Sequence, residues 1–199
     1  MRAVRAIRAR LAQEAGYSLV EMLTVMTILT VVMTGLTALF VQGSNAELDM
    51  NARFQAQEDA RVALDRMRRD LHCGSAATSS SSTSITIADP CATGSQLSWC
   101  VLTSGGRLKL FRQTGTTACT TSSTEYADYL LATNAGGSQP TFFAYQPQST
   151  STLATVYVCI PVNAKQNRTN DAYALQDAIA LQNSTRTGSA STVSQPSCP

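Results

Sequence analysis

The sequence predicts an α+β fold, in which one long N-terminal α-helix packs on a small antiparallel β-sheet domain that carries disulfides. Three observations predict it. An apolar run extends from Tyr17 to Val41, a stripe of small and apolar side chains follows as far as Leu71, and beyond Gly74 short β-rich segments alternate with Ser/Thr-rich ones. A continuous apolar run and a stripe at steps of three and four indicate helix, whereas short β-branched and aromatic runs indicate strands.

The apolar run comes first, and its length predicts a membrane-spanning helix. Glu21 is the only charge between Tyr17 and Val41, and Gly35 is the only helix-weakening residue there. About 20 apolar residues suffice to cross a bilayer as a helix. A lone carboxylate in lipid costs roughly 2.5–3.5 kcal/mol on insertion scales, so Glu21 requires a cationic partner.

Basic residues precede this run and predict its orientation. Four arginines lie ahead of it, at positions 2, 5, 8 and 10. Arginines on one flank of a span hold that flank in the cytoplasm, so everything after Val41 should face outward. An ordinary signal anchor has the same pattern. A cleaved secretory signal fits less well, because its apolar region covers only about 7–15 residues.

The helix is expected to continue beyond the apolar run. No proline occurs from Ser44 to His72. One face carries small and apolar residues at helical spacing, namely Leu48, Ala52, Ala56, Ala60, Ala63, Leu64, Met67 and Leu71. A continuous helix from Tyr17 to about Leu71 would be roughly 80 Å long, with a bend allowed at Gly43 and Ser44. Charged residues on the other faces predict a solvated half, with ion pairs Asp49–Arg53 and Asp65–Arg69.

Beyond Gly74, five runs read as strands, and Ser/Thr tracts at 75–84, 114–124, 147–155 and 183–194 read as connections. The runs are Ile85–Ile87, Gln96–Leu102, Leu108–Phe111, Thr141–Tyr145 and Leu153–Ile160. Ser104-Gly105-Gly106 supplies the positive φ angles of a tight hairpin. The segment Asp177–Asn183 is compatible with a strand or with a short helix. Trp99 and Tyr157 are expected in the sheet core.

All six cysteines lie in the outward-facing part, which suits an oxidising compartment. They are Cys73, Cys91, Cys100, Cys119, Cys159 and Cys198. An even number fits three disulfides, although six cysteines allow 15 pairings. Near-neighbour pairs are favoured, namely Cys73–Cys91, Cys100–Cys119 and Cys159–Cys198, the last of which would pin the Ser/Thr-rich tail. Free thiols or a metal site are the alternative, which the absence of Cys-x-x-Cys and the single histidine disfavour.

Composition leaves little room for other functions. Without its first 16 residues the chain carries 11 basic and 12 acidic residues, so its charge falls from +2 to −1. Bulk charge therefore leaves nucleic-acid binding unsupported. No nucleophile elbow, phosphate-binding glycine loop or zinc-protease motif occurs. His72 at a helix end reads as a dipole-compensating or solvated residue. We therefore expect no catalytic residues, no metal and no cofactor.

The junction Gly16-Tyr17-Ser18-Leu19-Val20-Glu21 resembles the class III signal of the type IV pilin superfamily, which includes minor pilins and pseudopilins. The resemblance implies that a membrane aspartyl peptidase cuts after Gly16 and that the new amino terminus on Tyr17 becomes N-methylated. It also implies that this amino terminus, on a neighbouring subunit, is the cation for Glu21. The family usually has Phe where this chain has Tyr17.

Two further blocks resemble J-type (PilW-like) minor pilins. Ala63–Leu71 is similar to the end of their long helix, and Val156–Ile160 followed by Ala178–Asn183 is similar to their paired closing strands. This resemblance favours a strand over a helix for Asp177–Asn183. It covers, with the leader, about a third of the chain.

The domain organisation expected from these features is a leader at 1–16, a transmembrane and assembly helix at 17–42, its amphipathic continuation at 43–73 and a β-rich head at 74–199. The resemblance implies a minor pilin or pseudopilin, not an enzyme. Its partners would be other pilin subunits, the prepilin peptidase, the membrane assembly platform and the cytoplasmic membrane, where it would reside before reaching the cell surface. A tip-located adhesion or DNA-binding pilin and a single-pass anchored protein that forms no fibre are the alternatives. The sequence does not distinguish a retractile pilus from a type II secretion or DNA-uptake pseudopilus.

Overall fold

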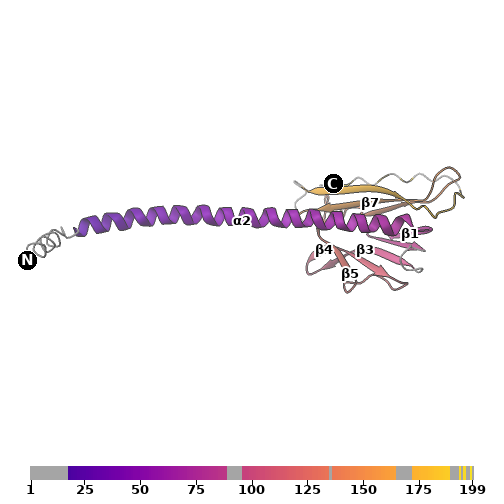
Figure 1. Cartoon of the computed structure of the whole chain (residues 1–199), viewed down its shortest axis with the longest axis horizontal. Helices are drawn as coiled ribbons and strands as arrows, with labels where there is room; N and C mark the ends of the chain where they lie inside the picture. The colour runs from indigo at the N-terminus through magenta and orange to yellow at the C-terminus, as the bar shows by residue number, and fades with distance from the viewer. Residues whose placement is uncertain are drawn as a thin grey trace, which may run out of the picture. The chain divides into compact units, whose positions relative to one another are not determined.

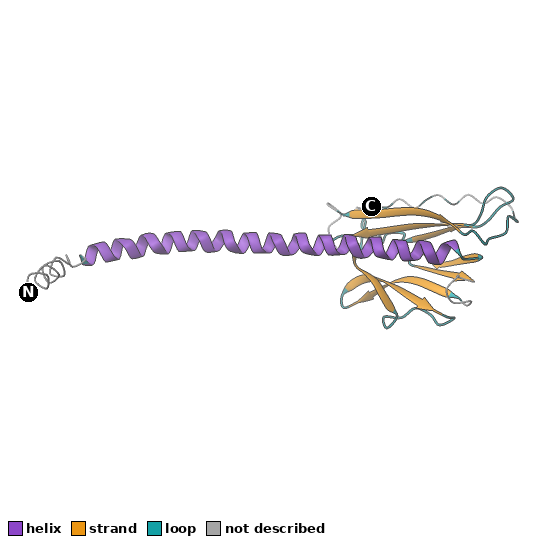
Figure 2. Cartoon of the chain, viewed as in Figure 1, coloured by secondary structure: helices purple, strands orange, loops and turns teal. Residues whose placement is uncertain are grey.

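A computed structural model describes residues 18–88, 96–134, 136–164 and 172–188, together with residues 193, 195 and 198. It contains one long helix, α2 (Leu19–His72), followed by eight strands within these residues (Figures 1 and 2). Contacts within the chain form two compact units, one up to Leu48 and one from Asp49 onward. The predicted α+β fold with a long helix and an antiparallel sheet is confirmed.

The helix is continuous from Leu19 through Gly43 to His72, close to the predicted end at Leu71. Its second half supplies the predicted stripe to the core of the unit from Asp49 onward. The buried members are Ala56, Ala60, Ala63, Leu64, Met67 and Leu71. Small alanines at the start of this stripe let the helix backbone approach the strands closely. Leu48 was expected in the stripe but is 65% exposed.

The strands form one curled antiparallel sheet in the order β1-β2-β3-β4-β5-β7-β6, with β8 on the other side of β7. They are β1 (Ala76–Ser81), β2 (Ser84–Ala88), β3 (Leu97–Ser104), β4 (Arg107–Thr114), β5 (Thr124–Leu130), β6 (Phe143–Gln146), β7 (Thr155–Val162) and β8 (Tyr173–Ala180). Ser82 O accepts hydrogen bonds from the amides of Phe142 and Phe143, which brings the β1–β2 turn to the start of β6.

The glycine hairpin and the closing pair of strands were both predicted correctly. Gly105 and Gly106 connect β3 to β4 with φ angles of 60° and 77°, which a two-residue turn between twisted strands requires. Strand β8 pairs with β7 along its whole length, with Val156 opposite Ile179. Because β8 begins at Tyr173 and ends at Ala180, the predicted boundaries of this strand were about four residues late.

Two strands were missed. Strand β1 lies inside the Ser/Thr tract read as a connection, and its pairing with β2, together with burial of Ala77, overrides the weak β-propensity of serine. Strand β5 escaped notice because Glu125 and Asp128 interrupt its apolar residues, and because Tyr129 bends the strand with a φ of 60°. Register shifts interrupt its pairing with β4.

Trp99 and Tyr157, both predicted in the sheet core, differ in their burial. Trp99 is fully buried, as expected. Tyr157 lies on the other face of the sheet, where it is half-buried and donates its hydroxyl hydrogen to Gln146 Oε1 at 2.8 Å. The neighbours of Tyr157 in β7, Val156 and Val158, face the core instead. This prediction was wrong because alternation along β7 places Tyr157 opposite the face that meets the helix.

Candidate assembly site

The first part of α2, up to Leu48, packs on nothing within the described residues. Its most apolar 18-residue window has a mean hydropathy of 2.1, and none of that window is buried. By length and composition this segment can cross a membrane, and it is the one described helix with that property. Such a surface is stable only in lipid or against other proteins, because water disfavours contiguous exposed apolar area.

Glu21 lies in the first turn of α2 and is exposed. A carboxylate in this position interacts favourably with the positive end of the helix dipole, typically by 0.3–1 kcal/mol at an exposed site. The same turn is held by the amide of Met22, which donates to Ser18 O at 3.1 Å. Gly16 and Tyr17, the predicted cleavage and methylation residues, lie outside the described residues. The pairing of Glu21 with a neighbour's amino terminus therefore stays a prediction.

Five threonines interrupt the apolar surface of this part of the helix at steps of three and four. They are Thr24, Thr27, Thr30, Thr34 and Thr37. Each hydroxyl donates to a backbone carbonyl three or four residues earlier, at 2.7–2.8 Å. These bonds satisfy the hydroxyl donors without a partner helix, so the threonines can face lipid or another apolar helix at little polar cost.

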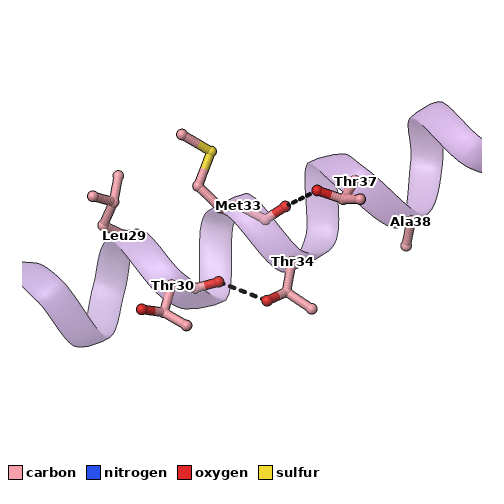
Figure 3. A pocket seen from close by; sticks show the side chains of 6 residues that line it. All are labelled: Leu29, Thr30, Met33, Thr34, Thr37 and Ala38. Carbon is pink, nitrogen blue, oxygen red and sulfur yellow. Dashed lines mark hydrogen bonds between the residues drawn. The ribbon is translucent and has the colours of Figure 1, made fainter.

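Three of these threonines line an open groove on the helix surface. Its residues are Leu29, Thr30, Met33, Thr34, Thr37 and Ala38. Figure 3 shows the short threonine and alanine side chains beside the longer Leu29 and Met33, with Thr34 bonded to Thr30 O and Thr37 to Met33 O. This groove was not predicted, because threonine was counted only as part of the apolar run, although the spacing of Thr30, Thr34 and Ala38 was a readable signal.

In the unit from Asp49 onward, a buried carboxylate joins the helix to the sheet. Asp70 is only 3% exposed. Its Oδ2 accepts hydrogen bonds from Arg112 Nε at 2.8 Å and from Trp99 Nε1 at 3.2 Å, and its Oδ1 accepts from Arg112 at 3.2 Å. Arg66 lies 3.5 Å from Oδ1 as a second cation. Asp70 was predicted among the solvated charges of the helix, and this prediction was wrong. Its spacing of three from Met67 and seven from Ala63 put it on the buried stripe.

Hydrogen bonds also join the last turns of α2 to β8 and to the segment that follows β8. Arg68 Nε donates to Asp177 Oδ2 at 2.6 Å, and the amide of Gln182 donates to His72 O at 3.1 Å. Asn183, which was predicted in the closing strand, lies beyond the end of β8 and donates from its side chain to Cys73 O at 2.9 Å, next to the end of the helix. Asp49–Arg53 is confirmed as an ion pair, whereas Asp65 pairs with Arg68 and not with Arg69.

Each of the two described disulfides joins a strand of the sheet to a segment outside the strands. Cys100 in β3 is bonded to Cys119, and Cys159 in β7 to Cys198, as the near-neighbour pairing predicted. Cys73 is also disulfide-bonded, whereas Cys91 lies outside the described residues. Among the described cysteines none is free, so the alternative of buried thiols is wrong for them.

Comparisons with known proteins address the N-terminal region. Residues 11–37 match the model of the prokaryotic N-terminal methylation motif. This motif is the class III prepilin signal, and it supports a type IV pilin-like protein that prepilin peptidase processes. The signal read from Gly16 to Glu21 is thereby confirmed. No curated protein and no solved structure matches the chain.

Proposed function

We propose that this chain is a minor pilin or pseudopilin of the J type, which assembles into a type IV pilus or a secretion or DNA-uptake pseudopilus. The observation that carries the proposal is the N-terminal methylation motif at residues 11–37, which overlaps the apolar first part of α2, where no residue of the most apolar 18-residue window is buried. The subunit acts by assembly and not by catalysis.

In this proposal the helix has two successive environments. Before assembly the segment 17–42 anchors the chain in the cytoplasmic membrane, with the disulfide-bonded head outside. Removal of the leader takes away a charge of +3 that holds the N-terminal flank in the cytoplasm and creates the amino terminus that Glu21 of another subunit can pair with. A paired carboxylate is less costly in an apolar environment than an unpaired one, which favours docking.

Mass spectrometry of the membrane-extracted chain tests the processing step. The expected mature protein begins at N-methylated Tyr17, and Gly16→Val should leave the leader attached, because a branched side chain then occupies the cleavage site. Ala15→Val is a matched control, since it places the same side chain one residue before the cleavage site. A parent chain that still begins at Met1 would contradict the proposal.

Fractionation tests assembly separately. The processed chain should appear in the sheared surface fraction together with other pilin subunits. A processed chain that remains wholly in the membrane would instead indicate a single-pass anchored protein.

A further inference from the structure

The sheet carries a second buried patch on the face that does not meet α2. Cys100 in β3 and Phe111 in β4 lie opposite each other in the two strands, and they are 2% and 1% exposed. We call these two residues the outer patch. Their neighbours Trp99 and Leu110 point to the other face, where they join the core beneath the helix. Because α2 lies on that other face, a different segment must keep water from the outer patch.

Residues 115–123, which connect β4 to β5, lie over the outer patch, and we call this segment the strap. Cys119 near its centre is bonded to Cys100. The Sγ atom of Cys119 lies 3.8 Å from Ser98 O and 4.0 Å from Phe111 O. The strap therefore crosses β3 and β4 at the position of the patch.

The strap has little besides this disulfide to hold its centre in place. It consists of glycine, threonine and serine with one exposed alanine and Cys119, and it carries no charged side chain. Hydrogen bonds to neighbouring segments lie at its two ends, where the Gly115 amide donates to Gln96 O at 2.7 Å and Ser123 Oγ donates to Gln113 Oε1 at 2.7 Å. Ordering each residue costs conformational entropy, and the strap buries no large apolar side chain that would offset this cost.

Gly115 provides a hinge at the start of the strap. Its φ angle is 94°, and a Cβ atom there would meet nothing within 4 Å. Glycine has no side chain to restrict its backbone angles, and open space surrounds this position. The strap can therefore swing away from the sheet at Gly115 without a clash.

We propose that the strap is a redox-dependent cover, which closes over the outer patch when Cys100 and Cys119 are bonded and opens at Gly115 when they are reduced. Reduction by a dithiol breaks the S–S bond, transfers two electrons and two protons to the two cysteines and leaves the reductant as a disulfide. Exchange with an oxidant disulfide reverses these transfers. The core beneath α2 keeps its contacts in both states, because it lies on the other face of the sheet.

The open state exposes the Phe111 ring to water. Exposed apolar surface of this kind favours association with other apolar surfaces, so the redox state of the compartment decides whether β3 and β4 present such a surface. The device concerns the head alone and does not depend on how the chain assembles.

Alkylation of a single thiol in the full-length, detergent-solubilised chain tests the device. Cys119→Ser removes the bond and leaves Cys100 as a free thiol beneath the strap. Leu110→Cys in the otherwise unchanged chain is the matched reference, since position 110 is 1% exposed on the core face of the neighbouring strand and reports opening of the whole head. Iodoacetamide should modify Cys100 in Cys119→Ser at least tenfold faster than it modifies the thiol introduced by Leu110→Cys.

Hydrogen exchange locates the opening. The amides of residues 115–123 should exchange at least tenfold faster in Cys119→Ser than in the parent, while those of α2 and of Leu110 keep their rates. Cys198→Ser, which breaks the other described disulfide, is the control and should leave exchange of the strap unchanged.

Three results would overturn the proposal. Slow alkylation of Cys100, equal to that of the reference thiol, would show that the strap stays closed without its bond. Fast alkylation of Cys100 with faster exchange throughout the sheet would show that loss of the bond unfolds the head. Equal acceleration of strap exchange in Cys198→Ser would show that the effect does not belong to the Cys100–Cys119 bond.

Discussion

Asp70 and Arg112 are 42 residues apart in the chain, and Arg112 closes a bidentate contact on the buried Asp70 carboxylate with hydrogen bonds of 2.8 and 3.2 Å. The pair joins the last turns of α2 to strand β4. Trp99 Nε1 contributes a third hydrogen bond from β3, so one carboxylate fixes the helix against two neighbouring strands. Charge-assisted bonds of this kind are stronger than neutral ones, and their geometry specifies how the partners are placed.

Asp70→Ala should destabilise the chain by about 3–5 kcal/mol, because it leaves a guanidinium that is only 10% exposed without its partner. Urea unfolding of the detergent-solubilised chain measures this loss. Asp65→Ala, which removes an exposed carboxylate of the same helix, should change stability by less than about 1 kcal/mol. Adding Arg112→Met to Asp70→Ala should recover part of the loss, and strict additivity of the two changes would contradict a coupled pair.

The environment of Asp59 predicts that the folding stability of the chain depends on pH. Burial, and then repulsion from Asp128, Glu125 and Glu58, raises the pKa of this carboxyl above its ordinary value of 3.8. The protonated form therefore favours folding, with a contribution that is fully present below pH 3.8 and lost as the pH rises through the raised pKa. Asp59→Asn should stabilise the chain at pH 7 by a few tenths of a kcal/mol, because partial exposure screens the repulsion.

Thermal unfolding at two pH values checks the Asp59 effect. The variant and the parent should differ at pH 7 and converge near pH 3.5, where the parent carboxyl is itself protonated. An equal difference at both pH values would show that packing, and not charge, is responsible. Glu47→Gln is a control, since Glu47 is exposed on the same helix.

Much of this fold was readable because its signals are local. The apolar run after Tyr17, the alanine stripe before Leu71 and the Gly105-Gly106 hairpin each need only neighbours in sequence. Strand β1 could not be predicted from its own residues, because its serines form a strand only through pairing with β2. Asp70 was misplaced because its cationic partner comes from a distant strand.

The candidate assembly site was likewise predicted only in part from the sequence. The prepilin signal is a contiguous motif and was predicted directly, whereas the threonine groove is a surface of a helix. Its residues are grouped by helical spacing, which was present in the sequence but was hidden within the apolar run. Helical spacing alone assigned Leu48 to the buried stripe, but its side chain is exposed in the structure.

Gly74 follows the helix at a close approach. A Cβ atom there would lie 2.6 Å from Ile87 Cγ2 and 3.3 Å from the carbonyl oxygen of Leu71. Gly74→Ala should therefore destabilise the chain by about 1–3 kcal/mol through overpacking. Gly43→Ala should have the opposite sign, a gain of about 0.5–1 kcal/mol, because Gly43 is helical with open space around it. Chemical denaturation of the two variants in parallel measures this contrast.

The two described disulfides close loops of different length, with sequence separations of 19 and 39. In the chain-entropy model they contribute about 3 and 4 kcal/mol respectively. Replacing Cys159 and Cys198 together by Ala should thus cost slightly more stability than replacing Cys100 and Cys119. Peptide mapping without reduction should recover both bridges in the parent chain, and a bridge between Cys100 and Cys198 would contradict this connectivity.

Substitution of Glu21 tests whether the exposed part of α2 takes part in assembly or serves only as a membrane anchor. Glu21→Val makes the span more apolar by removing a carboxylate that costs roughly 2.5–3.5 kcal/mol in lipid, so the variant should insert and be processed at least as well as the parent. If the carboxylate pairs with the amino terminus of a neighbour, the same change removes that attraction, and incorporation into fibres should fall at least tenfold. The ratio of sheared to membrane-bound chain measures incorporation, with Glu47→Gln as a control for loss of a helix charge outside the span. Equal ratios for Glu21→Val and the parent would show that the carboxylate takes no part in assembly.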